Sequence, residues 1–83
     1  MIDPFEVLTK SIQTIQDQQD YPKVEVQPGF HLVHDLGLAS LDIAQLLAMM
    51  ECELGIDPFV HGATLDQVAT VKDMADLYFK NIN

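Results

Sequence analysis

The residue best suited to chemistry is Ser40, which stands directly before an amphipathic stretch of the chain. A serine hydroxyl can act as a nucleophile or accept a covalently bound group. The free amide groups and the dipole of a helix N-terminus favour an anion such as a phosphate. Asp35 and Asp42 flank this serine. The same position also suits an ordinary helix N-cap, so the serine alone does not decide between the two interpretations.

The histidine pair His31-x-x-His34 is the nearest approach to a metal motif. No third ligand follows at a convincing spacing, so we interpret both histidines as surface or loop-packing residues and predict no metal site. A nucleophilic site made of Ser40, His34 and Asp35 would need a base that a third group orients. His34 and Asp35 are chain neighbours, whose side chains tend to point apart, and we therefore predict no catalytic site.

Cys52 is the chain's one cysteine and stands between Glu51 and Glu53. Negative neighbours disfavour the thiolate, which is the reactive form. We therefore expect a semi-exposed thiol that is not a catalytic nucleophile, and its role stays open.

The elements that position these residues are predicted to be helices. Asp3 and Pro4 suit a helix start, and an apolar stripe at spacings of three and four follows. This stripe consists of Phe5, Leu8, Ile12 and Ile15. Tyr21-Pro22 should end the helix. Residues 20 to 39 show no period and predict a long ordered loop, held by the apolar side chains of Val24, Phe30, Leu32 and Leu36.

The strongest helical pattern runs from Ser40 to Leu54, and Gly55 stands where a helix commonly stops. Its expected buried face consists of Leu41, Leu46, Leu47, Met50 and Leu54. A short helix should start at Thr64-Leu65-Asp66-Gln67. Thr70-Val71-Lys72-Asp73 has the capping-box pattern and should open the last helix. Its expected inner side consists of Val71, Met74, Leu77 and Tyr78.

The composition predicts one domain over residues 1–83, because 83 residues leave no room for a second. Apolar residues make up 48% of the chain, enough for a small core. A net charge of −9 with four Lys and Arg excludes phosphate-neutralising nucleic-acid binding and argues against anionic membranes. One cysteine forms no internal disulfide, and no signal pattern opens the chain. We therefore expect a soluble cytoplasmic protein.

The acidic charge is concentrated in the middle of the chain. Between Val24 and Val71 there are seven acidic residues and no Lys or Arg. Such a field raises the association rate of a basic partner, although a run of charge is often only a solvated face.

The segment Asp35-Leu36-Gly37-Leu38-Ala39-Ser40-Leu41-Asp42 resembles the attachment site of acyl carrier proteins. The similarity continues over nearly the whole chain. It includes the amphipathic first helix, the long loop, Glu53-Leu54-Gly55-Ile56, the short third helix and the Thr70 capping box. Their order and spacing together are more specific than any one of them.

This resemblance implies an all-α fold, a small four-helix bundle of three longer helices and one short helix, with a long loop between helices 1 and 2. It implies that Ser40 carries a 4′-phosphopantetheine arm, transferred from coenzyme A by a phosphopantetheinyl transferase. The arm holds acyl cargo as a thioester, so the protein is a non-catalytic carrier. We expect a monomer. Its further expected partners are loading enzymes, synthases or ketosynthases, and tailoring enzymes with basic docking patches.

The expected partner surface lies on and near the second helix. It consists of Asp35, Leu41, Asp42, Gln45, Met49, Glu51 and Glu53.

Departures from the family pattern bear on the pathway. The usual Asp-Ser-Leu is Ala39-Ser40-Leu41 here, and Gln45 and Cys52 occupy positions that are commonly acidic in fatty-acid carriers. These departures favour a specialised polyketide or hybrid polyketide–nonribosomal peptide pathway over housekeeping fatty-acid synthesis. Two alternatives stay open: an aminoacyl or peptidyl carrier of a nonribosomal pathway, and an unmodified acidic helical interaction module.

Overall fold

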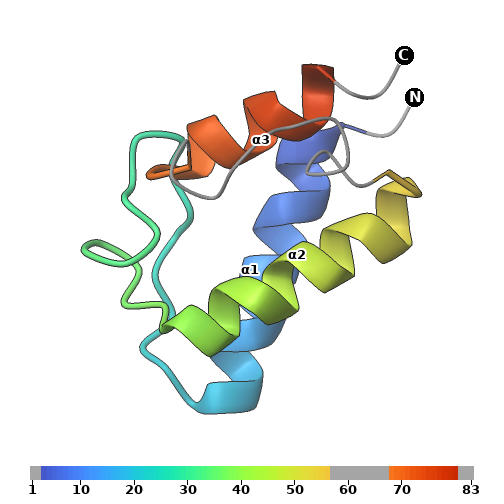
Figure 1. Ribbon diagram of the computed structural model, residues 1–83. Helices are drawn as coiled ribbons and strands as arrows, with labels where there is room; N and C mark the ends of the chain where they lie inside the picture. The colour runs from blue at the N-terminus through green and yellow to red at the C-terminus, as the bar shows by residue number, and fades with distance from the viewer. Residues whose placement is uncertain (1–2, 57–67, 81–83) are drawn as a thin grey trace.

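Three α-helices make up the regular structure of the residues that the structure describes. The computed structural model describes residues 3–56 and 68–80, and its helices are α1 (Pro4–Gln19), α2 (Ser40–Leu54) and α3 (Val71–Lys80). α1 packs against both α2 and α3 (Figure 1). Within the two described ranges there is no β-strand, only an isolated bridge between His31 and Thr70. The expected all-α fold is confirmed, while the short helix expected from Thr64 lies outside the described residues.

α1 begins and ends as its sequence predicts. The Asp3 carboxylate accepts the backbone N–H of Phe5 at 3.0 Å, and Pro4 takes the first helical position. The helix ends at Gln19 and is followed by its C-cap residue Asp20, whose φ of 57° is left-handed. The predicted apolar stripe is confirmed, because Phe5 is partly buried and the other three members, Leu8, Ile12 and Ile15, are fully buried.

The connection between α1 and α2 is anchored by four buried side chains. Leu32 and Leu36 are buried and Phe30 is partly buried, as expected. The expectation for Val24 is wrong, because this side chain is exposed. The other two anchors are Val26 and Leu38. An irregular segment has no repeating period, so the sequence could not show which of its apolar residues turn inward.

Backbone hydrogen bonds fasten this connection to the start of α3. The N–H of Leu32 donates to the carbonyl of Ala69 at 3.0 Å, and the N–H of Val71 donates to the carbonyl of Phe30 at 2.9 Å. The N–H of Lys72 donates to the carbonyl of Pro28 at 2.9 Å. The first amides of a helix have no partner within the helix, and the connection supplies acceptors for two of them. In Figure 1 it runs from the end of α1 past the start of α3 to the start of α2.

The capping box predicted at the start of α3 is confirmed. The Asp73 carboxylate accepts the N–H of Thr70 at 3.0 Å, and the Thr70 hydroxyl accepts the N–H of Asp73 at 3.1 Å. Hydrogen bonds from the backbone, with the one from Thr70 first, hold the pKa of Asp73 below its usual value. On the inner side of the helix Val71, Met74 and Tyr78 are buried.

The apolar segments of the described chain are short. None of the helices found in residues 3–56 and 68–80 has the length and apolar character needed to cross a membrane.

Candidate functional site

Ser40 lies at the corner where the long connection meets α2. It is the first residue of the helix, it is exposed, and its hydroxyl makes no hydrogen bond within the described residues. A tight turn precedes it, in which Gly37 has a φ of 71° and donates its N–H to the carbonyl of Val33 at 3.0 Å. The buried Leu38 then fixes the chain just ahead of the helix. A firmly held backbone therefore presents a free hydroxyl to solvent.

The helix start beneath Ser40 is capped in an unusual way. The N-cap residue is Ala39, which has no side-chain acceptor for the first amides of the helix. Only the reciprocal half of a capping box exists, in which the Asp42 carboxylate accepts the N–H of Ala39 at 2.9 Å. The amides of Ser40, Leu41 and Asp42 have no acceptor within the described residues.

Asp42 points into the protein, not toward a partner. Its residue surface is only 3% exposed, and the same carboxylate oxygen that binds Ala39 accepts the hydroxyl of Tyr21 at 2.6 Å. The expectation that Asp42 belongs to the partner surface is therefore wrong. The reason is that an acidic residue in the first turn of a helix can turn back to the helix end and bind its amides.

Tyr21 is a site residue that the sequence did not reveal, because its position suggested only a helix end. The hydrogen bond to Asp42, then burial, then the negative charge of Asp42 raise the pKa of Tyr21 above 10.0. The two residues are 21 positions apart, and no local pattern signals such a pair.

The other residues expected on the partner surface divide into exposed and half-buried groups. Leu41 is 79% exposed, so its second expected role, in the core, is wrong. Glu51, Glu53 and Asp35 are exposed as well. Helical side chains lean toward the N-terminus of their helix, so Leu41, in the first turn of α2, belongs to the helix end near Ser40.

Three of these residues also contact the protein itself. The Asp35 carboxylate accepts the N–H of His31 at 2.6 Å and so stabilises the turn before Ser40. Gln45 is half-buried and donates its amide to Gln18 at 2.7 Å, which ties α2 to α1. Met49 is half-buried and lines a groove between α1 and α2.

The histidines stabilise the loop. Their ring centroids lie 4.3 Å apart, and His31 Nδ1 accepts the backbone N–H groups of Val33 and His34, each at 3.1 Å. This confirms the loop-packing interpretation for His31. In the part of the chain that the structure describes, no three His, Cys, Asp or Glu side chains form a group suited to a metal ion.

Comparison with known proteins identifies relatives of this chain. No protein-family model matches it. An acyl carrier protein of Nitratidesulfovibrio vulgaris (strain Miyazaki F) is 36% identical over 72 residues, which cover 87% of this chain and 91% of the relative. The acyl carrier protein of the strain DP4 is 36% identical over 62 residues, which cover 75% of this chain and 79% of the relative.

A solved structure agrees with these relatives. MacpD, an acyl carrier protein from Pseudomonas fluorescens involved in mupirocin biosynthesis, superposes with a TM-score of 0.79 at 32% identity. The match covers 89% of this chain and 66% of the MacpD chain. Acyl carrier proteins are non-catalytic and act together with synthases and modifying enzymes. From the agreement of fold and sequence, the chain belongs to the acyl carrier protein family.

Proposed function

We propose that this protein carries acyl intermediates as thioesters on a 4′-phosphopantetheine arm attached to Ser40. The observation that supports this most is the geometry of the helix start. Ser40 is exposed, its hydroxyl is unbonded, and three amides beside it have no acceptor within the described residues. A phosphodiester at this hydroxyl would meet both the amides and the positive end of the helix dipole. When bound, the arm supplies the thiol that holds the cargo.

The protein itself supplies a rigid attachment point and a surface. The buried Asp42 carboxylate fixes Ala39 and Tyr21 below the attachment point, so the helix start is held without occupying Ser40. Around it, the exposed Leu41 offers an apolar contact. Asp35 and Glu51 are exposed acids suited to a basic transferase, loading enzyme, synthase or tailoring enzyme.

We further propose a role in a specialised polyketide or hybrid polyketide–nonribosomal peptide pathway. The similarity to MacpD, a carrier involved in mupirocin biosynthesis, supports this assignment. So does Ala39 as the N-cap in place of the family's usual Asp, because it shows a helix start that departs from the common pattern.

Intact-protein mass spectrometry tests the attachment. The apo protein is incubated with coenzyme A and a broad-specificity phosphopantetheinyl transferase, and peptide mapping then locates any added group. The chain has only two serines, so Ser40→Ala has a natural matched control in Ser11→Ala. Ser11 is 5% exposed, and we expect its variant to be modified like the wild type.

The expected result is one added phosphopantetheine in the wild type and in Ser11→Ala, and none in folded Ser40→Ala. Modification of Ser40→Ala would disprove the attachment site. No modification of a folded wild-type protein would instead favour an unmodified acidic interaction module, whose partner binding would be insensitive to Ser40→Ala.

A further inference from the structure

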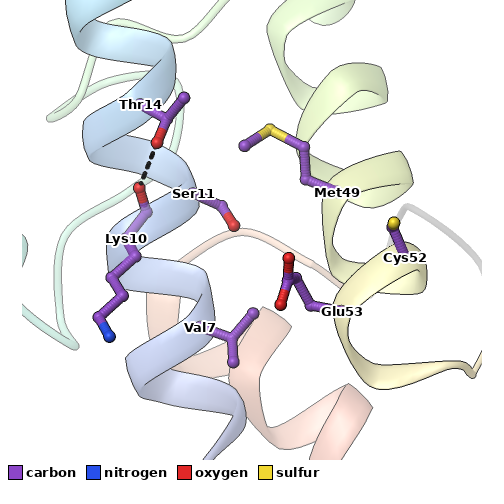
Figure 2. A pocket seen from close by; sticks show the side chains of 7 residues that line it. All are labelled: Val7, Lys10, Ser11, Thr14, Met49, Cys52 and Glu53. Atoms are coloured by element: carbon purple, nitrogen blue, oxygen red, sulfur yellow. Dashed lines mark hydrogen bonds between the residues drawn. The ribbon is translucent and has the colours of Figure 1, made fainter.

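A groove of about 330 Å³ lies between α1 and α2, beside the last turns of α2 and away from Ser40. It is lined by Val7, Lys10, Ser11, Thr14, Met49, Cys52 and Glu53. Figure 2 shows Ser11 of α1 and Glu53 of α2 directed toward each other across this space, with the apolar Val7 and Met49 beside them. The groove thus combines apolar walls with two facing polar groups.

Ser11 is a buried polar residue without a partner. It is 5% exposed, and within the described residues its hydroxyl has no hydrogen bond. The nearby Thr14 differs, because its hydroxyl donates to the carbonyl of Lys10 at 3.0 Å. In the described residues the one fully shielded side-chain N or O atom without a partner is Gln16 Nε2, so the Ser11 oxygen is still accessible from the groove that it lines. A ligand in the groove would supply the missing hydrogen bond.

Glu53 lacks a cation. No ion pair involves it in the described residues. The groove's own cation, Lys10, pairs with Glu6 at 3.4 Å, and its side chain runs away from α2 in Figure 2. The facing groups are therefore one uncompensated carboxylate and one neutral hydroxyl, both of which accept hydrogen bonds. This arrangement selects a positively charged donor over an anion.

We infer that the groove between α1 and α2 binds a primary ammonium group at the end of the cargo, with Glu53 and Ser11 as its acceptors and Val7 and Met49 beside its aliphatic stem. The inference rests on the proposed attachment of an arm at Ser40. Ser40 and Glu53 stand thirteen positions apart on one helix, about 20 Å along its axis at 1.5 Å per residue. The arm and its cargo together must cover that distance. The acceptors Glu53 and Ser11 select an acyl cargo that ends in an amine.

Three loaded forms of the protein test the inference. A phosphopantetheinyl transferase loads the protein from coenzyme A analogues whose arms end in amide-linked 4-aminobutyryl, 4-hydroxybutyryl or pentanoyl groups, and intact mass verifies each loading. The three cargoes have nearly the same length and differ in the terminal group. Thermal unfolding and backbone amide NMR shifts at Ser11 and Glu53 are then compared in low and high salt.

The amine-loaded form should melt about 1–8 °C above the pentanoyl form in low salt, the range for one partly exposed ion pair in a small domain. Its NMR shifts should move at Ser11 and Glu53. Glu53→Gln should abolish the difference, and Ser11→Ala should reduce it. The matched control is Glu51→Gln, which removes one exposed charge of α2 outside the groove and should leave the difference intact.

Each outcome is decisive. Loaded forms with equal melting temperatures and equal shifts would overturn the groove assignment and leave the carrier function standing. If Glu51→Gln reduced the melting-temperature difference between the loaded forms as much as Glu53→Gln does, the assignment would be overturned as well, because the amine would then respond only to overall charge. Failure to load the analogues at all, seen in the mass spectrum, would count against the attachment at Ser40.

Discussion

Replacing Asp42 with alanine tests whether this buried carboxylate holds the start of α2. The substitution removes the acceptor for the N–H of Ala39 at 2.9 Å and for the Tyr21 hydroxyl at 2.6 Å. Because Asp42 is only 3% exposed, water cannot simply replace the lost carboxylate. We expect a folded but less stable protein in which the helix start around Ser40 is loosened.

The loss should be about 2 kcal/mol. A helix cap contributes about 1 kcal/mol, and a hydrogen bond to a charged group about 1.5–3 kcal/mol. The burial of a carboxylate itself costs free energy, and alanine removes that cost, so the net loss is smaller than the sum of these two terms. For a domain of this size, about 2 kcal/mol lowers the melting temperature by about 8–16 °C.

Urea unfolding of Asp42→Ala, Tyr21→Phe and the double variant gives the assay. Tyr21→Phe keeps the ring and removes only the hydroxyl, so it should cost less than Asp42→Ala. The double variant should be little worse than Asp42→Ala, because both changes break the same hydrogen bond. An Asp42→Ala protein within about 0.5 kcal/mol of the wild type, the usual range for surface changes, would refute the buried-cap reasoning.

Three further measurements probe other parts of the structure. The pKa of Tyr21 is raised above 10.0, so its hydrogen bond stabilises the fold at pH below 10 and is lost as pH rises through the pKa of the folded state. Above pH 10 the melting temperature should therefore fall more steeply with rising pH in the wild type than in Tyr21→Phe. Since the pKa of Asp73 is lowered below 3.8, its contribution is present above pH 3.8 and is lost as pH falls through the folded value. The melting temperature should therefore fall less steeply with falling pH in Asp73→Asn than in the wild type, and equal slopes in the two proteins would contradict the capping role. Leu41→Ala should change the free energy of unfolding by no more than about 0.5 kcal/mol and should slow modification by the transferase. Leu46→Ala should lower the free energy of unfolding in urea by about 2–5 kcal/mol.

The elements with a strong local signal were predictable from the sequence. The apolar spacing and the capping residues act within one or two helical turns, so the bounds of α2 and the capping box of α3 are confirmed residue by residue. The position of Ser40 at the start of α2 is confirmed as well, because capping signals act between neighbouring residues, while its role as the attachment site stays a prediction. The family resemblance added the chemistry, and the curated relatives and MacpD support the family.

The errors concern burial and contacts that the apolar period of a helix does not show. The sequence assigned Asp42 to the surface because acidic residues are usually solvated, and only the fold brings Tyr21 beneath it. Leu41 fits the helical period of the core, but it lies in the first turn of α2 and is exposed. The groove between α1 and α2 depends on residues about 40 positions apart, so no motif could have indicated it.

The burial of Asp42 changes where charge acts around Ser40, the proposed attachment point. A carboxylate that already accepts two hydrogen bonds inside the protein is shielded from a docking enzyme, so the exposed charge near Ser40 on the loop side comes from Asp35. The remaining exposed acids of α2, Glu51 and Glu53, lie in its last turns. Between them and Ser40 the exposed surface of α2 is uncharged. A partner enzyme would therefore meet the apolar Leu41 beside the hydroxyl and acidic groups at both margins, an arrangement in which the charges steer the approach and the apolar contact sets the final position.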